Sequence, residues 1–126
     1  MKLLLDTHIL LWWLEDSRNL KKVARELITA PENQVFVSAA TAWEIEIEQA
    51  AGKLDFAREV AEAFAEVGFK QLEIHFTHTA ESGRLPLIHS DPFDRMLVAQ
   101  ARLEDLHLLT VDPRVLAYPA PVVDCR

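Results

Sequence analysis

Short apolar runs alternate with longer amphipathic segments along this chain. The short runs are predicted to be buried strands, and the longer segments, in which apolar residues recur three and four positions apart, are predicted to be helices. The expected strands cover residues 3–5, 35–37, 72–76 and 108–110, with 122–123 as a candidate fifth. The expected helices cover residues 9–14, 17–30, 43–51 and 56–67, a short segment after Thr77 that ends before Pro86, and 91–103.

One segment, residues 43–48, fits both periodicities. Its glutamates and apolar residues alternate as in a strand, yet Trp43, Ile47 and Ala50 also share one face of a helix, and Gly52 is suited to end it. A strand here would follow residues 35–37 without room for a parallel crossover, whereas Ser38 or Thr41 offers an N-cap. A helix is therefore predicted.

Strands that alternate with helices indicate an α/β fold, with a mostly parallel sheet between two helical layers and right-handed crossovers. The chain has 126 residues, which suits a single domain over residues 1–126 with one well-buried core. Residues 9–14 are too short to cross a bilayer, so no membrane association is expected.

The formal net charge is −7, which argues against a protein that holds nucleic acid on a broad basic face. Basic residues gather only locally, at Arg18, Lys21, Lys22 and Arg25. The single cysteine, Cys125, can form no internal disulfide, and no Cys-x-x-Cys pair suggests structural zinc. A reducing, cytoplasmic location is expected.

Four carboxylates occur where an apolar run ends and a helix is expected to begin: Asp6, Glu44, Asp94 and Asp112. Open parallel sheets place ligand sites at the carboxyl ends of their strands, so these acids are expected to converge. Mutual repulsion would make such a cluster unstable without a divalent cation, which indicates a Mg²⁺ or Mn²⁺ site. Phosphodiester hydrolysis is chemistry that suits such a site.

Helix capping alone offers a simpler explanation for each acid. Asp6 and Asp112 can cap the helices that follow them, and Thr41-x-x-Glu44 has the pattern of a capping box. In Asp91-Pro-Phe-Asp94, Asp91 is expected to be the N-cap and Asp94 the metal ligand.

The histidines show no metal-binding pattern. His75-x-x-His78 has no cysteine partner, so zinc is not expected there, and His8, His89 and His107 are expected to be surface or loop residues.

Several motifs together resemble the PIN-domain family, and most closely its VapC-type toxins, over essentially the whole chain. They are Leu-Leu-Leu-Asp6-Thr-His8, Val37-Ser-Ala-Ala-Thr-Ala-Trp-Glu44-Ile, Gly52-Lys-Leu, Asp91-Pro-Phe-Asp94-Arg95 and Leu109-Thr-Val-Asp112. The resemblance implies a PIN-like three-layer α/β/α sandwich with a central sheet of four to five strands. It further implies a Mg²⁺- or Mn²⁺-dependent endoribonuclease, the toxin of a type II VapBC system, with a VapB-type antitoxin as partner.

The resemblance also implies residue roles. Asp6 and Asp94 would hold the principal metal, and Glu44 would bind it through water or help to deprotonate the nucleophile. Asp112 would complete a second metal position and is the acid expected to matter least.

Other side chains are expected to support this site. The hydroxyls of Ser38 and Thr110 would orient a water or a carboxylate, and Arg95 would either contact a phosphate or pair with an acid. Trp12, Trp13 and the apolar side of residues 20–28 offer more hydrophobic surface than a small core needs, so part of it is expected to form a homodimer interface or an antitoxin groove.

Two alternatives stay open. A receiver-like or interaction domain would need the acids only for folding and would bind no metal tightly. A haloacid-dehalogenase-like phosphatase also begins with an apolar strand and an aspartate, but its pattern is Asp-x-Asp, and His8 stands where the second acid belongs.

Overall fold

The computed structural model describes residues 1–54 and 59–126 and has one all-parallel sheet of five strands. The strands are β1 (Lys2–Leu5), β2 (Gln34–Ser38), β3 (Lys70–Leu72), β4 (His107–Thr110) and β5 (Val122–Asp124). Their order is β3-β2-β1-β4-β5, so the chain winds outward from β1 first in one direction and then in the other. The expected α/β architecture is confirmed.

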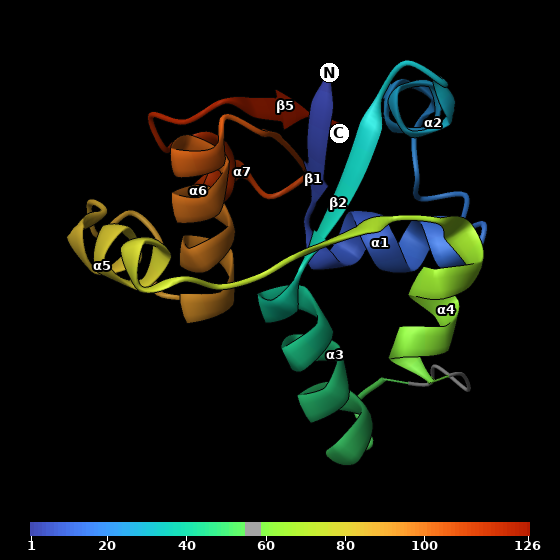
Figure 1. Ribbon diagram of the computed structural model, residues 1–126, viewed down its shortest axis with the longest axis horizontal. Helices are drawn as coiled ribbons and strands as arrows, with labels where there is room; N and C mark the ends of the chain where they lie inside the picture. Colours follow the sequence, from blue (N-terminus) through green and yellow to red (C-terminus); the bar gives the residue numbers. More distant parts are fainter. Residues whose placement is uncertain (55–58) are drawn as a thin grey trace.

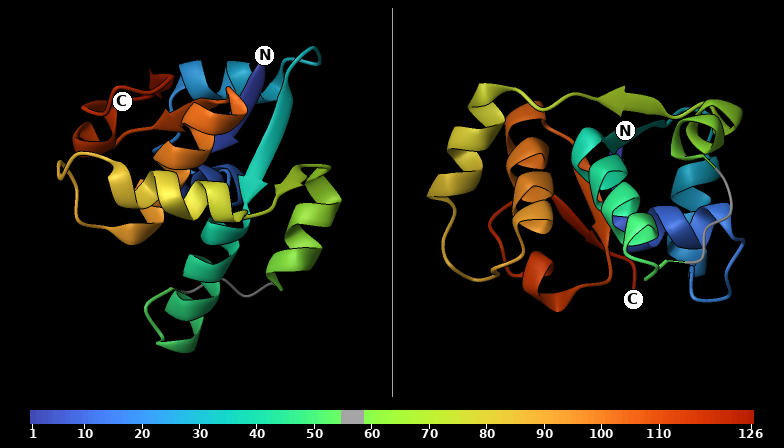
Figure 2. Two further views of the ribbon diagram at one scale, coloured as in Figure 1. Left: turned by 60° about the vertical axis from the view of Figure 1, so that its left-hand side comes forward. Right: turned by 90° about the horizontal axis from the view of Figure 1, so that it is seen from below.

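Helices cover both faces of this sheet, as Figures 1 and 2 show. They are α1 (Thr7–Leu14), α2 (Lys22–Thr29), α3 (Ala39–Ala50), α4 (Val60–Val67), α5 (Phe76–Arg84), α6 (Pro92–Glu104) and α7 (Pro113–Leu116). In Figure 1, α1, α2 and α4 lie on one side of the sheet and α5, α6 and α7 on the other, while α3 extends beyond the carboxyl end of β2.

The sheet separates two hydrophobic cores because successive side chains of a strand point to opposite faces. Leu3 and Leu5 of β1 pack in the core with α1, α2 and α4, whereas Leu4 packs in the core with α6 and α7. Leu109 and Leu108 of β4 divide in the same way. Both faces are covered, as the continuous apolar strand sequences predict.

Helix α2 begins five residues later than residue 17, the start that the sequence predicts. Arg25 explains the difference, because its guanidinium donates to the backbone carbonyls of Ser17 (2.6 Å) and Leu20 (3.2 Å). Leu20 still joins the core, from the loop. On the predicted apolar face, Leu20, Ala24 and Ile28 are buried but Val23 is exposed, and the predicted helix boundary was wrong.

Strand β3 ends at Leu72, short of the predicted residue 76. The carbonyl of Glu73 accepts a hydrogen bond from the side chain of Gln100 on α6 (3.1 Å) instead of continuing the sheet. Phe76 is 92% exposed and begins α5, and the N-cap of that helix is His75, not Thr77.

The segment that fitted both periodicities is a helix, α3, as predicted, and its N-cap is Ser38. Helix α4 ends at Gly68, whose φ of 72° is the left-handed conformation that favours glycine at this position. The predicted start of that helix, at residue 56, lies outside the described residues.

The apolar surface expected to be in surplus near the N-terminus is mostly used by the core. Trp12, Trp13 and Leu27 pack against the cluster around β1, and the Trp13 ring lies 6.4 Å from that of Phe69. Val23 alone of these expected surface residues is well exposed, at 41%. Over residues 1–54 and 59–126, no helix has the length and apolar character needed to cross a membrane.

Candidate functional site

Asp6 lies where the winding of the sheet reverses. It follows β1, its backbone N–H bonds to the Leu109 carbonyl of neighbouring β4 (3.1 Å), and it caps α1 by accepting from the N–H of Ile9 (2.8 Å). Ligand sites of open α/β sheets form at this kind of strand switch. Asp6 therefore caps α1 and also lies where a ligand site is expected.

Burial raises the pKa of Asp6 to about 6. Hydrogen bonds from the Thr110 hydroxyl and from Ile9 oppose the rise, and the negative charge of Asp94 adds to it. Thr110 therefore contacts Asp6, and its role in orienting that carboxylate stays a prediction.

Asp91 is the N-cap of α6, as the sequence predicted, and Asp94 is not. Asp91 caps α6, accepting from the N–H groups of Phe93 (2.8 Å) and Asp94 (3.2 Å). The carboxylate of Asp94 instead lies 2.8 Å from Nε2 of His89, with Asp112 close by. Burial and the charge of Asp91 raise the pKa of Asp94, whereas a hydrogen bond with His89 lowers it.

Glu44 lies on α3 and faces the start of α1. The Thr7 hydroxyl donates to its Oε1 at 2.5 Å, and the capping box expected with Thr41 does not form, since Ser38 is the N-cap. Burial raises the pKa of Glu44, the bond from Thr7 opposes this, and the charges of Asp91 and Asp94 raise it further.

Asp112 differs from the other three acids because a cation compensates its charge. It caps α7 and accepts from the guanidinium of Arg114 at 3.1 and 3.2 Å. Although partial burial raises it, the pKa of Asp112 is held below its ordinary value by these bonds and by the positive charge of Arg114.

Asp94 is the centre of the cluster. The charge of Asp94 contributes to the raised pKa of Asp6 and of Glu44. The charge of Asp112 contributes to the raised pKa of Asp94. The structure therefore brings Asp6, Glu44 and Asp112 within electrostatic reach of Asp94.

His89 also belongs to this cluster. It lies in a loop, as expected, but it is buried and not on the surface. Its side chain is only 4% exposed, and its Nε2 lies 2.8 Å from Asp94 and 3.5 Å from Asp112. Among the described residues, the potential ligand atoms of His89, Asp94 and Asp112 all lie within 4.8 Å of one another.

Arg95 takes neither of the roles expected for it. Its guanidinium donates to the backbone carbonyls of Ser82 (2.8 Å), Pro86 (3.0 Å) and Leu85 (3.1 Å) and to the Tyr118 hydroxyl (3.1 Å). With these donors used, Arg95 shapes the loop before α6 and is not placed to bind a phosphate.

Ser38 also has structural contacts. Its hydroxyl accepts from the N–H of Ala40 (3.0 Å) and donates to the side-chain oxygen of Gln100 (2.6 Å), which is fully buried. These bonds join β2, α3 and α6 and show no contact with the four acids.

The donor set fits a hard divalent cation. Carboxylate oxygens are the ligands that Mg²⁺ and Mn²⁺ prefer. The pKa values of Asp6, Glu44 and Asp94 are all raised, so ionising them together is unfavourable, and a bound cation would reverse that cost. Asp112, already paired with Arg114, needs a cation least.

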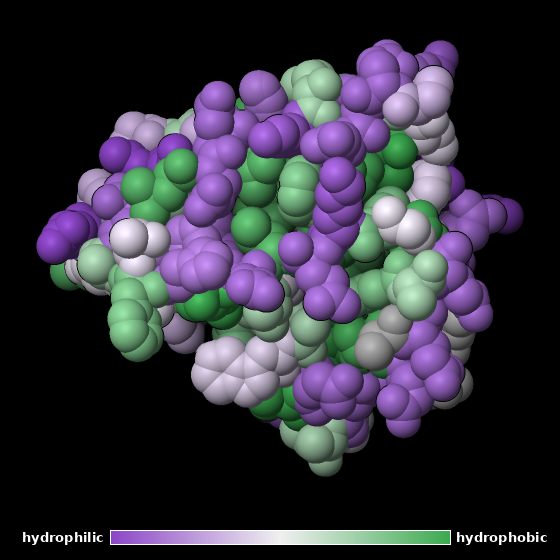
Figure 3. Space-filling model, in the orientation of Figure 1, coloured by the Kyte–Doolittle hydropathy of each residue, from purple (hydrophilic) through white to green (hydrophobic). Residues whose placement is uncertain are grey.

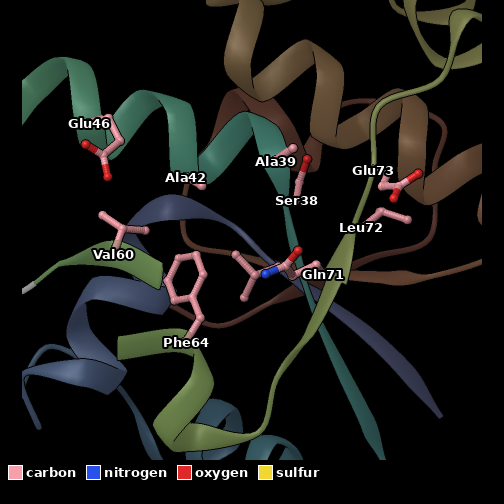
Figure 4. A pocket seen from close by; sticks show the side chains of 10 residues that line it. Ser38, Ala39, Ala42, Glu46, Val60, Phe64, Gln71, Leu72 and Glu73 are labelled. Carbon is pink, nitrogen blue, oxygen red and sulfur yellow. The ribbon is translucent and has the colours of Figure 1, made fainter. Parts of the chain in front are cut away.

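An apolar cavity of about 240 Å³ lies beside the site, between α3, α4 and the ends of β2 and β3. Figure 4 shows Ala42 and Glu46 of α3 facing Val60 and Phe64 of α4 across it. On the face of the molecule that Figures 1 and 3 present, hydrophobic side chains lie in the hollow middle, between strips of polar ones. None of the four acids lines this cavity.

Comparison with known proteins agrees with the geometry. The family model of the PIN domain matches residues 3–120. No curated protein matches the chain.

Solved structures with the same fold include a toxin–antitoxin complex from Klebsiella pneumoniae, at 22% identity and a TM-score of 0.70 over 98% of each chain. VapBC2 from Rickettsia felis, bound to a DNA fragment from its promoter, matches at 15% identity and a TM-score of 0.71 over the whole of both chains. VapBC-1 from nontypeable Haemophilus influenzae matches at 15% identity and a TM-score of 0.61 over 98% of each chain. At these identities the likeness establishes the fold alone.

Proposed function

The chain belongs to the PIN-domain family, and we propose from this premise that it is a Mg²⁺- or Mn²⁺-dependent endoribonuclease, the toxin of a type II VapBC toxin–antitoxin pair. One observation carries the proposal: Asp6 lies at the strand switch point of the sheet, and the charge of Asp94 acts on both Asp6 and Glu44, with the pKa of all three raised. The solved structures of similar fold support it, since one is described as a toxin–antitoxin complex and two are described as VapBC.

A divalent cation held by these acids would polarise a phosphoryl oxygen of RNA and lower the pKa of a bound water. Asp6 and Asp94 are the side chains proposed to hold it. The Thr110 hydroxyl keeps Asp6 in one orientation, and His89 does the same for Asp94.

Glu44 is the proposed proton acceptor for the attacking water. The bond from Thr7 occupies its Oε1 and leaves Oε2 as an acceptor, and its raised pKa makes it a stronger base than an exposed glutamate. Asp112, whose charge Arg114 compensates, is proposed to complete a second, substrate-dependent metal position.

The proposed protein partner is a VapB-type antitoxin. The cavity between α3 and α4 is apolar inside and has Glu46 and Glu73 among its lining residues, which suits an amphipathic segment that carries Lys or Arg. A homodimer stays a prediction. Co-expression with the product of a short neighbouring reading frame, followed by purification of the complex, tests the partner.

A non-catalytic domain is the second candidate, because Asp6, Asp91 and Asp112 do cap helices. Calorimetry with Mn²⁺ separates the two, since a domain that uses its acids only for folding binds no metal tightly. The phosphatase alternative gains no support: His8, at the position of the required second acid, is exposed beside the Trp12 ring.

The deciding experiment compares Asp6, which follows β1, with Asp124, the last residue of β5. Asp6→Asn should abolish both the rise in melting temperature with millimolar Mn²⁺ and the Mn²⁺-dependent cleavage of RNA. Asp124→Asn is the matched control, because Asp124 ends β5 but is bonded to Arg126. Retention of cleavage by folded Asp6→Asn would reject the proposed mechanism.

A further inference from the structure

Trp43 leaves most of its indole in solvent, with the residue 62% exposed, whereas the other two tryptophans pack against a core. Its ring centroid lies 5.2 Å from that of Phe93, and the two planes meet at 68°, which is an edge-to-face pair. Trp43 belongs to α3 and Phe93 to α6, so the pair spans two helices that contact each other. Phe93 is itself partly buried against a core and supports the tryptophan from one side.

Each ring directly precedes an acid of the site, Trp43 before Glu44 and Phe93 before Asp94. Successive side chains of a helix diverge by roughly 100°, so the rings flank the acids instead of lying among them. A group that stacked on Trp43 would therefore sit next to whatever the acids and their cation hold.

The shortage of free positive charge near the acids gives a reason for stacking on Trp43. RNA binding depends on cations that contact phosphate, yet the net charge of the chain is −7. Near the acids, Arg95 is bonded to backbone carbonyls and Arg114 to Asp112. Uncharged contacts would therefore add to the affinity that the proposed divalent cation supplies at this site.

We propose that Trp43, supported by Phe93, is the platform on which an unpaired nucleobase of the substrate stacks beside the phosphate to be cleaved; this rests on the proposed ribonuclease function. Indole stacking requires a free face of the base, which single strands and loops present and a continuous duplex does not. Because every base has such a face, the platform selects for unpaired RNA and little for base identity.

Binding is tested in an Asp94→Asn background, which prevents cleavage. Trp43→Ala should weaken the affinity for a single-stranded RNA about 5- to 100-fold, and Trp43→Phe should restore part of it. The loss should persist at high salt, because stacking is not screened as ion pairs are. Affinity for a blunt duplex of the same sequence should change little.

Phe76→Ala is the matched control. Phe76 is an exposed aromatic residue, at 92%, but it begins α5 near the Glu104 end of α6, since His78 of α5 bonds to Glu104. RNA affinity of Phe76→Ala should equal that of the parent. A 2-aminopurine base placed in turn along the RNA should lose fluorescence at one position with the parent, and this loss should disappear with Trp43→Ala.

Equal RNA affinity of the Trp43→Ala and Phe76→Ala variants, or no quenched position, would overturn the stacking proposal. So would a Trp43→Ala variant that keeps RNA binding but loses a co-expressed protein partner, because the contact would then belong to that partner. The ribonuclease proposal fails separately, if the chain with Asp94 intact cleaves no RNA with Mn²⁺.

Discussion

Each end of helix α6 has a carboxylate bonded to a buried histidine, but the surroundings of the two pairs differ. At its first turn Asp94 accepts from His89, and at its last residue Glu104 accepts from His78; in both pairs Nε2 lies 2.8 Å from the carboxylate and the imidazole is buried. Distance and burial therefore do not distinguish the pair at the proposed site from the pair at the other end of the helix.

The hydrogen bonds around each imidazole do distinguish them. The Nδ1 of His78 accepts from the backbone N–H of His75 at 2.9 Å, so its proton must be on Nε2 and both ring nitrogens are satisfied. The Nδ1 of His89 has only a long contact of 3.5 Å, and its Nε2 is shared between Asp94 and Asp112. The His78 pair is a closed structural network, whereas the His89 pair is open toward further ligands.

The charges around each carboxylate differ as well. Asp94 lies among acids that raise its pKa, and Glu104 ends a helix, where the macrodipole disfavours a negative charge. His78 bonds to Glu104 at that end, whereas at the other end His89 and Arg114 face several acids, and the pKa of Asp94 is still raised, first of all by burial. The comparison shows that the charges and open hydrogen-bonding positions around a histidine–carboxylate pair are more informative about a metal site than the pair itself.

Replacement of Asp94 and of Glu104 should give the largest difference in RNA cleavage. Asp94→Asn should lower Mn²⁺-dependent RNA cleavage by about a thousandfold, because a direct metal ligand supplies several kcal/mol to the reaction. Glu104→Gln should cleave within about threefold of the parent. Initial rates on one labelled RNA measure both, and circular dichroism checks that each variant folds. A similar loss in the two variants would mean that α6 matters only as a whole.

Metal-free protein should lose stability as pH rises from about 4 to 6. The pKa of Asp6 is about 6 in the folded protein and 3.8 ordinarily, so the native state binds more protons in this window and the free energy of unfolding falls with pH. At neutral pH the cost from Asp6 is ~3 kcal/mol, and Glu44 and Asp94 shift in the same direction.

Urea unfolding in chelator at several pH values measures this dependence. Asp6→Asn should flatten the curve between pH 4 and 6, and added Mn²⁺ should do the same in the parent protein. Glu104→Gln should leave it steep, since that carboxylate lies at the other end of α6. Stability that increased over this window in chelator would contradict the raised pKa values.

Removal of the two imidazoles should separate stability from activity. His78→Ala deletes a fully buried ring and leaves the His75 N–H without its partner, so the free energy of unfolding should fall by about 2–3 kcal/mol while the folded fraction still cleaves RNA. His89→Ala should cost about tenfold in cleavage, because it no longer orients Asp94. Chemical denaturation and single-turnover cleavage check the two predictions.

Much of the fold could be predicted because its strands are continuous apolar runs and the helices α1, α3, α6 and α7 have side-chain N-caps. Asp91 before Pro92 and Gly68 after α4 mark their boundaries through local backbone chemistry. The start of α2 and the end of β3 could not be predicted, since long side chains, Arg25 and Gln100, bond to the backbone there.

The acids of the site could be predicted for a similar reason, because strand ends and helix starts converge in a parallel sheet. His89 could not, since it lies in a loop whose shape depends on Arg95 and on bonds to Tyr118. Its position two residues before Asp91 was its only signal. Conversely, the more noticeable His75-x-x-His78 pattern proved to be a helix cap.

Asp91→Asn should have the smallest effect, although Asp91 lies three residues from Asp94. Asparagine caps a helix as well as aspartate does, so the bonds from the N–H groups of Phe93 and Asp94 should persist and stability should change by less than about 0.5 kcal/mol. Loss of the Asp91 charge should slightly lower the pKa of Asp94, which Asp91 raises. Asp91→Ala, which removes the cap, should cost about 1 kcal/mol and serves as the comparison. Thermal unfolding with parallel RNA cleavage measures both variants, and an Asp91→Asn variant as inactive as Asp94→Asn would make Asp91 a member of the catalytic cluster.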